Sequence, residues 1–323
     1  MAERHLVALA LLGTLLLAVP GLRYRIDGNS CASWPPVGHS LGYAALYLLA
    51  LLLLTVAWLG LVRRASEPGG PSLRRVLIYA ALVHATALVV PPFLSDDPLF
   101  YAALSRVLSA FGSSPYVPLC RTLPAGDPFL TVLSPGWQCG TSAYFPGFHA
   151  LALAIGKLGG ASLTLHLRLY QLAGASAMLL TAWVAGAALR PTRWPPALGA
   201  ALVAWNPIAL IEGSINAHND ALLALGCAAF VYFVVRERPL SALLTLGATL
   251  AVKASAGLLL GMYALVLLLG PVRRRWPVLC RRLPWAIGAA LAVALAAIAV
   301  LPAPAGGLNM FTALVGSPAD PWD

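Results

Sequence analysis

The chain has 323 residues, of which 60% are hydrophobic and only 10% are charged, and its mean hydropathy is +0.82. Soluble domains carry about 25% charged residues, so this composition excludes an ordinary soluble protein and indicates a polytopic membrane protein. The formal net charge of +10 follows from basic residues kept in cytoplasmic loops, so it requires no nucleic-acid partner. We therefore expect one all-α integral membrane domain over residues 1–323.

Apolar runs follow one another along the chain, and many approach the roughly 20 residues that a membrane-spanning helix needs. Several are short for a full crossing, which favours tilted or broken helices. The runs predict a bundle of about nine or ten transmembrane helices, at 6–22, 40–62, 76–94, 169–189, 195–212, 220–235, 239–253, 255–270 and 285–302, with 147–160 as an ambiguous further run.

Arginines gather in the hinges between these runs, and they predict the orientation of the bundle because basic residues are retained on the cytoplasmic side. The opposite face then receives residues 23–39, 95–146 and 213–219. If 147–160 crosses the membrane, however, Arg190 would lie outside with the following hinge. Either 147–160 is a half-crossing or interfacial helix, or a further crossing lies within 161–189. The basic hinge residues are Arg63, Arg64, Arg74, Arg75, Arg190, Arg193, Arg236, Arg238, Arg273, Arg274, Arg275, Arg281 and Arg282.

The external loop 95–146 opens with Asp96 and Asp97, directly after an apolar run. A carboxylate at the end of a membrane segment is costly and indicates a functional site. Paired carboxylates can act as a general base or bind a divalent cation such as Mg or Mn. The alternative is that one of them caps a helix. The residues that follow predict an amphipathic helix over Leu99–Phe111, suited to lying on the membrane surface.

Two cysteines of this loop, Cys120 and Cys139, lie on the face where a disulfide is permitted. A bridge between them would close the loop. Spacing alone does not fix connectivity, so two unpaired thiols are an equal alternative.

A second polar cluster, Glu212 to Asp220, joins two apolar runs and includes His218 and Asn219. Glu212 and His218 together suit a polar wall for a sugar, whereas Asp220 could simply cap the helix that follows. Lys253 then interrupts a long uncharged stretch, where a lysine costs several kcal/mol unless it is paired or reaches the interface. It suits a lipid phosphate, with an ion pair to Glu212 or Asp220 as the alternative.

Other chemistries lack their motifs in this sequence. There is no glycine-rich nucleotide-binding loop, no Cys/His set with zinc spacing and no serine nucleophile elbow. A nucleotide-dependent enzyme is therefore not expected. Arg106 and Arg121 are secondary candidates for binding a phosphate, and each can equally be an ordinary loop charge.

Four elements in order resemble the GT-C superfamily of polytopic glycosyltransferases, above all bacterial polyprenyl-phosphomannose-dependent alpha-mannosyltransferases and the GPI mannosyltransferase I group. The likeness covers roughly residues 90–270. The chain departs from the pattern at Gly147, where the family has a second proline, and it is short for the family, as a C-terminally truncated chain would be. The elements are Asp96-Asp97-Pro98-Leu99-Phe100-Tyr101 with Gly112-Ser113-Ser114-Pro115-Tyr116, then Tyr144-Phe145-Pro146-Gly147, then Trp205-Asn206-Pro207 with Glu212-Gly213 and His218-Asn219-Asp220, and finally Lys253.

The resemblance implies an enzyme of the bacterial inner membrane that works on its extracytoplasmic face. It would move a hexose, by default mannose, from a polyprenyl-phosphate donor to a glycan or glycolipid acceptor, with inversion. Asp96 or Asp97 would be the general base, with or without a divalent cation. The implied substrate-binding residues are Tyr101, Arg106, Tyr116, Tyr144, Glu212, His218, Asn219, Asp220 and Lys253.

A non-catalytic member of the same fold, or a transporter of lipid-linked sugars, is the competing interpretation. A transporter is expected to carry its polar residues at mid-membrane depth and to show two related halves. Here the polar residues gather toward one face and no repeat is visible, which favours an enzyme.

Overall fold

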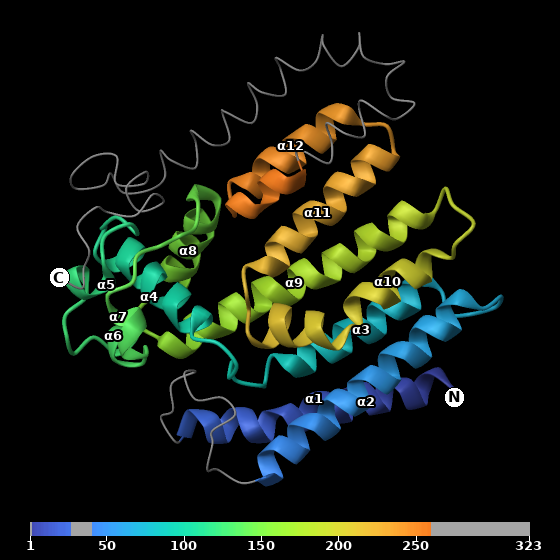
Figure 1. Cartoon of the computed structure of the whole chain (residues 1–323), viewed down its shortest axis with the longest axis horizontal. Helices are drawn as coiled ribbons and strands as arrows, with labels where there is room; N and C mark the ends of the chain where they lie inside the picture. Colours follow the sequence, from blue (N-terminus) through green and yellow to red (C-terminus); the bar gives the residue numbers. More distant parts are fainter. Residues whose placement is uncertain (1, 27–40, 260–323) are drawn as a thin grey trace.

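The computed structural model describes residues 2–26 and 41–259, and every regular element within them is helical, which confirms the all-α class (Figure 1). The predicted run 285–302 and most of 255–270 lie outside the described residues. The elements are α1 (Glu3–Ile26), α2 (Leu41–Ser66), α3 (Leu73–Ala87), α4 (Asp97–Ala110), the one-turn helices α5 (Leu119–Thr122), α6 (Pro128–Thr131) and α7 (Pro135–Gln138), α8 (Pro146–Gly159), α9 (Leu163–Leu189), α10 (Pro196–Ala204), the π-helix η2 (Ala209–Ile215), α11 (Asp220–Val235), α12 (Pro239–Leu250) and the 3-10 turn η3 (Ala254–Ala256).

Two helices of the described part, α2 and α9, are long and apolar enough to cross a membrane by themselves. A third candidate is the pair α10 and η2, which is bent by 65°. The apolar run predicted over 195–212 is therefore broken near its middle, one of the forms that its short length favoured. The physical reason is Pro207, which disfavours helical backbone at Asn206 before it. The Asn206 side chain accepts a hydrogen bond from the Ile208 backbone N–H at 2.9 Å and stabilises the break.

The ends of the bundle differ in character (Figure 1). The α2–α3, α9–α10 and α11–α12 junctions, which carry the arginines, lie at one end, and α4 to α8 lie at the other. α8 has 14 residues, or about 21 Å of helix, which is shorter than the ~30 Å of hydrocarbon in a bilayer. It packs on α4, and α9 starts at the same end of the bundle. This arrangement favours α8 as a half-crossing or interfacial helix, and Arg190 then lies with the other hinge arginines.

The helix α4 is buried on nearly every side, so the expectation of a surface helix with one exposed face is wrong. All of its residues from Pro98 to Ser105 are buried. α8, α9 and α6 pack around it, because the loop folds back over the helix. Phe100 packs edge-on against Trp137, with 5.1 Å between the ring centroids.

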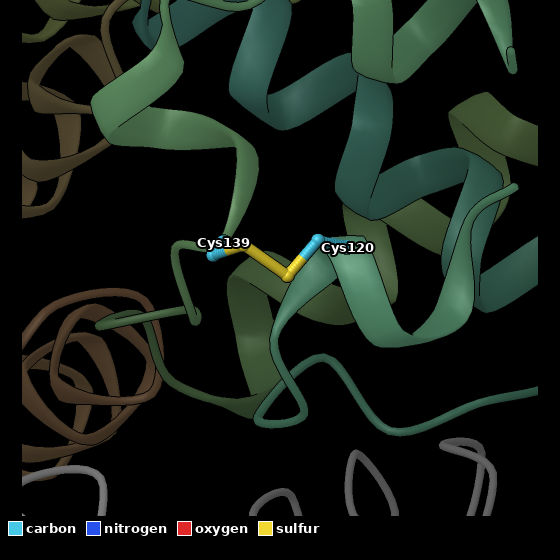
Figure 2. The surroundings of a disulfide bond; sticks show 2 residues. All are labelled: Cys120 and Cys139. Carbon is cyan, nitrogen blue, oxygen red and sulfur yellow. A yellow bond between two sulfur atoms is a disulfide. The ribbon is translucent and has the colours of Figure 1, made fainter. Parts of the chain in front are cut away.

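Cys120 and Cys139 form a disulfide, as one of the two alternatives predicted (Figure 2). The bond closes the part of the loop that contains α6 and α7. Beside it, the Leu119 backbone N–H donates to the Gly140 carbonyl at 3.2 Å. The disulfide therefore holds the loop that contains α6 and α7 close to the start of α4.

The chain breaks after α12, and the break docks on the start of α8. Lys253 has extended backbone there, and the Gly147 N–H donates to the Ala251 carbonyl at 2.6 Å. A proline at 147 would have no N–H to donate, which explains the departure from the family pattern at this position. The helix α12 ends at Leu250, three residues before the end of the apolar run predicted over 239–253.

Replacing Gly147 with alanine is expected to destabilise the protein. A Cβ at this position would lie 2.7 Å from the Ala251 carbonyl oxygen, and overpacking against backbone costs about 1–3 kcal/mol. Thermal unfolding of the full chain in nanodiscs measures the effect. Gly126→Ala is the matched control, because a Cβ there meets nothing within 4 Å. Equal melting temperatures for the two variants would contradict the argument.

Candidate active site

Asp97 stands at the start of α4, at the loop end of the bundle. Its Oδ2 accepts a hydrogen bond from the Tyr101 hydroxyl at 3.0 Å and lies 3.1 Å from His218 Nδ1. Its backbone N–H donates to the Ser95 hydroxyl at 3.1 Å. Its side chain is 19% exposed, so the carboxylate is held firmly yet remains reachable from outside.

His218 lies between two carboxylates. Nδ1 faces Asp97, and Nε2 is 3.2 Å from Glu212 Oε2. Because a carboxylate accepts and a protonated imidazole donates from both nitrogens, this geometry favours the imidazolium. The π-helix η2 turns the chain back, with Ala217 at a φ of 51° and His218 N–H donating to the Glu212 carbonyl at 2.9 Å. Such π-helical turns are frequent at functional sites.

The pair Asp97–His218 shifts the pKa of both members. Burial alone would raise the pKa of Asp97, but the hydrogen bond and charge of His218, the Tyr101 hydroxyl and the charge of Lys253 hold it below its usual value. Burial would likewise lower the pKa of His218, yet Asp97, Glu212 and Asp220 raise it above the usual value. At neutral pH the carboxylate form of Asp97 is favoured, with a positive partner beside it.

Three tyrosines line the same site. The Tyr101 and Tyr144 hydroxyls are 3.2 Å apart, and the Tyr116 hydroxyl donates to the Tyr144 carbonyl at 3.1 Å. Burial raises the pKa of Tyr116 and of Tyr144 to about 12, so both keep their hydroxyl protons at neutral pH. Tyr101 is fully buried, which makes it a support for Asp97.

Lys253 reaches the site from the break after α12. Its ammonium group donates to both carboxylate oxygens of Asp220, at 2.8 and 2.9 Å, and faces Asn219 Oδ1 at 3.4 Å. The ion pair that sequence analysis left as an alternative is therefore formed. Asp220 is the first residue of α11, but no side chain caps that helix. The Asn219 backbone N–H lies 3.5 Å from the Tyr101 hydroxyl, which joins this pair to the Asp97 group.

The three remaining predicted residues are Arg106, Asp96 and Arg121. Arg106 faces Asp127, with 3.4 Å between Nε and Oδ2, and lies over the Phe129 ring at 5.4 Å from its centroid. These contacts hold the loop to α4. Asp96 is buried, with 6% exposure, and its side chain makes no helix-capping hydrogen bond. Arg121, the other secondary candidate, is exposed on α5.

The acidic pair does not form a ready cation site. In residues 2–26 and 41–259, no group of three or more His, Cys, Asp or Glu side chains is arranged to hold a metal ion. Asp97 Oδ2 already faces His218 and Tyr101, so a divalent cation would have to use its other oxygen. The divalent cation that sequence analysis allowed stays a prediction.

Two buried amides adjoin the site, and the sequence patterns did not single them out. Gln171 on α9 and Asn216 after η2 are both fully buried. A lone amide inside an apolar run, as at Gln171, is a signal that could have found the first. Asn216 lies inside the second polar cluster but was not singled out there.

The opposite shifts of Asp97 and His218 predict how stability depends on pH. A raised pKa in the folded state gives His218 a stabilisation that is complete below its unfolded value of about 6.5 and is lost as pH rises through the folded value. The lowered pKa of Asp97 gives a stabilisation that is present above about 3.9 and is lost as pH falls through the folded value. The melting temperature should therefore be highest between about pH 4 and about pH 6.5.

Thermal unfolding of His218→Gln in nanodiscs tests this pH dependence. The decline in melting temperature above neutral pH should become much smaller, because His218 no longer titrates. His5→Gln, which replaces an exposed histidine of α1, should keep the decline. A decline of wild-type size in His218→Gln would refute the assignment.

An all-helical fold with candidate membrane spans and this polar cluster at one end defines a polytopic helical membrane protein. The chain belongs to the family described as alpha-(1->6)-mannopyranosyltransferase, N-terminal domain, whose model matches residues 6–269. This confirms the resemblance inferred from the sequence and extends it toward the N-terminus.

One curated relative supports the same family. The chain is 31% identical over 294 residues to alpha-(1->6)-mannopyranosyltransferase A of Mycobacterium tuberculosis (strain ATCC 25618 / H37Rv), and the match covers 88% of this chain. It covers 55% of the relative, so the chain spans about half the length of the curated protein that it matches. No solved structure matches the chain significantly.

Proposed function

We propose that this chain transfers a mannosyl group from a polyprenyl-phosphate donor to a glycan or glycolipid acceptor. The observation that carries the proposal is the meeting of Asp97, His218 and Glu212, with Lys253 and Asp220 beside them, at one end of a membrane bundle. The printed name of the family and of its mycobacterial relative supports mannose as the sugar. When a hydroxyl attacks a phosphate-linked sugar, a carboxylate can take the hydroxyl proton, and a nearby cation can stabilise the negative charge that develops on the leaving phosphate.

Asp97 acts as the general base in the proposed reaction. The acceptor hydroxyl oxygen bonds to the anomeric carbon on the face opposite the phosphate, and its proton passes to Asp97. The bond between the anomeric carbon and the phosphate oxygen breaks, and its electron pair stays on the phosphate. The configuration is therefore inverted. Asp97 is preferred to Asp96 because its carboxylate faces His218 and Tyr101, whereas Asp96 is more deeply buried.

Lys253 and His218 supply positive charge around this step. The leaving phosphate gains charge, which the Lys253 ammonium group stabilises if it turns from Asp220 toward the donor. His218 supports the base form of Asp97. Glu212, with a 43% exposed side chain, together with Tyr116, Tyr144 and Asn219, forms the polar wall that orients the sugar. A divalent cation, if one takes part, would bind at the free oxygen of Asp97.

We place this site on the extracytoplasmic face of the bacterial inner membrane. The Cys120–Cys139 disulfide in the loop supports this face, because disulfides persist in oxidising compartments. The arginine-bearing hinges at the opposite end of the bundle support it as well. A transporter of lipid-linked sugars is less well supported, because the polar groups of the cluster lie at the loop end and not at mid-depth.

The test is transfer of radiolabelled mannose from polyprenyl-phosphomannose in right-side-out membrane vesicles that contain the full chain. Label that moves to a glycan or glycolipid acceptor supports the proposal. Vesicles that contain the folded protein with its disulfide but transfer no label would favour the non-catalytic alternative.

A further inference from the structure

Two irregular segments carry the central pair of the site. Asp97 follows the segment 88–96 beyond the end of α3, and His218 follows η2. The two segments are distant in the sequence, so contacts from other parts of the protein must fix one relative to the other. Several of their residues are buried, and buried backbone groups need hydrogen-bond partners.

Gln171 supplies partners to both segments at once. Its Nε2 donates to the Val90 carbonyl at 2.8 Å and to the Ile215 carbonyl at 2.8 Å, and its Oε1 accepts from Arg168 at 2.8 Å. Every hydrogen-bonding position of the amide nitrogen is used, and the side chain is fully buried. Arg168 also donates to the Leu88 and Val90 carbonyls.

Asn216 makes a second connection between the same segments, closer to the site. Its Oδ1 accepts from the Phe93 N–H at 3.2 Å and from the Leu94 N–H at 3.3 Å. Asn216 is two residues from His218, and Leu94 is three residues from Asp97. The side chain is fully buried, so water competes little for these hydrogen bonds.

The helix α9 gives these connections a rigid base. It packs closely on η2, since a Cβ at Gly174 would collide with the Gly213 carbonyl oxygen. On the other side of η2, His84 of α3 lies 2.6 Å from the Ser214 hydroxyl. The helices α3 and η2, which precede the two irregular segments, are therefore fixed to each other and to α9, and Gln171 and Asn216 connect the segments to this rigid part.

We propose that Gln171 and Asn216 are positioning residues that set the distance between Asp97 and His218. The inference rests on the proposed role of Asp97 in catalysis. Neither amide contacts the carboxylate or the imidazole in the contacts above, so each acts through the backbone of its segment. A displacement of about 1 Å in a catalytic group can lower a rate by about 10²-fold.

The first experiment compares Gln171→Met with Thr181→Val in the transfer assay. Methionine keeps the length of the side chain but has no amide group. Thr181 is a buried polar residue of the same helix, and its hydroxyl donates to the Ala177 carbonyl within that helix. We expect Gln171→Met to lower kcat by about 10²-fold with little change in KM, and Thr181→Val to transfer as the wild type does. A wild-type kcat in folded Gln171→Met would overturn the inference.

A second measurement follows the Asp97–His218 distance without catalysis. The titration of His218 is recorded by NMR on the histidine-labelled full chain in nanodiscs, and its signal is assigned with His218→Gln. In Gln171→Met the pKa of His218 should fall toward its usual value, because Asp97 moves away from it. An unchanged titration would overturn the inference. If even the wild type transfers no mannose, the proposed function fails, and this titration still decides the inference.

The second amide provides a test that does not depend on how well Gln171→Met folds. Asn216→Asp keeps an oxygen that accepts from Phe93 and Leu94, whereas Asn216→Leu has none. We expect the aspartate variant to retain more of the transfer than the leucine variant, which offers no acceptor to the Phe93 and Leu94 N–H groups. Equal behaviour of the two variants, whether both retain or both lose function, would overturn the role assigned to the Asn216 oxygen.

Discussion

Replacing Asp97 with asparagine is expected to lower mannosyl transfer by about 10²–10⁴-fold, the usual contribution of a general base. The amide has nearly the shape of the carboxylate, but it cannot take the proton of the acceptor hydroxyl. His218 would lose the charge that Asp97 places 3.1 Å from Nδ1. The loss should appear in kcat, since asparagine still fills the space beside the sugar. Initial rates with radiolabelled donor in nanodiscs measure it.

Asp96→Asn is the matched control for this experiment. Asp96 is adjacent in sequence, but it is more deeply buried, with 6% exposure, and its side chain makes no capping hydrogen bond to α4. We expect Asp96→Asn to change transfer much less than Asp97→Asn when the amounts of folded protein are equal. The reverse order would assign the base to Asp96, and equal near-wild-type rates would exclude a carboxylate base from this pair.

The residues of the cluster could be predicted from the sequence because each is costly where it stands. Asp97 follows an apolar run, and Lys253 interrupts one, so each signals a function without any knowledge of the fold. His218 adds little by itself, and the GT-C resemblance gave it its place. These residues meet in the tertiary structure. The order of the motifs implied that they share a site, but their spacing in the sequence could not show which of them are in contact.

Other features depend on contacts between distant parts of the chain, so pattern alone could not reveal them. α4 has the spacing of an amphipathic helix, yet the loop that covers it buries the second face as well. Arg106 was a secondary phosphate candidate or an ordinary loop charge, and its contact with Asp127, 21 residues further on, could not be read from the sequence. Gln171 bonds carbonyls 81 and 44 residues away. An amide in an apolar run indicates that it has hydrogen-bond partners, but the sequence does not identify them.

Lys253→Met is expected to lower transfer by about 10²–10³-fold, as does the loss of a single group that stabilises developing negative charge. Methionine keeps the aliphatic length but removes the ammonium group. The same change removes the ion pair with Asp220, whose oxygens lie 2.8 and 2.9 Å from Nζ. Because the Lys253 and Asp220 side chains are 31% and 55% exposed, solvent screens this pair, and its loss alone should cost little stability. Transfer and melting temperature are therefore measured together.

A double-mutant cycle with Asp220→Asn separates catalysis from ion pairing. If Lys253 serves only to hold Asp220, both single variants and the double variant should transfer at similar rates. If Lys253 stabilises the leaving phosphate, Asp220→Asn should retain most of the transfer, because the ammonium group is then free to face the donor. Lys253→Met and the double variant should both remain slow. Exchanging the two residues, Lys253→Asp with Asp220→Lys, should restore the ion pair but not the transfer rate. Recovery of transfer in the exchanged variant would refute a role for Lys253 at the phosphate.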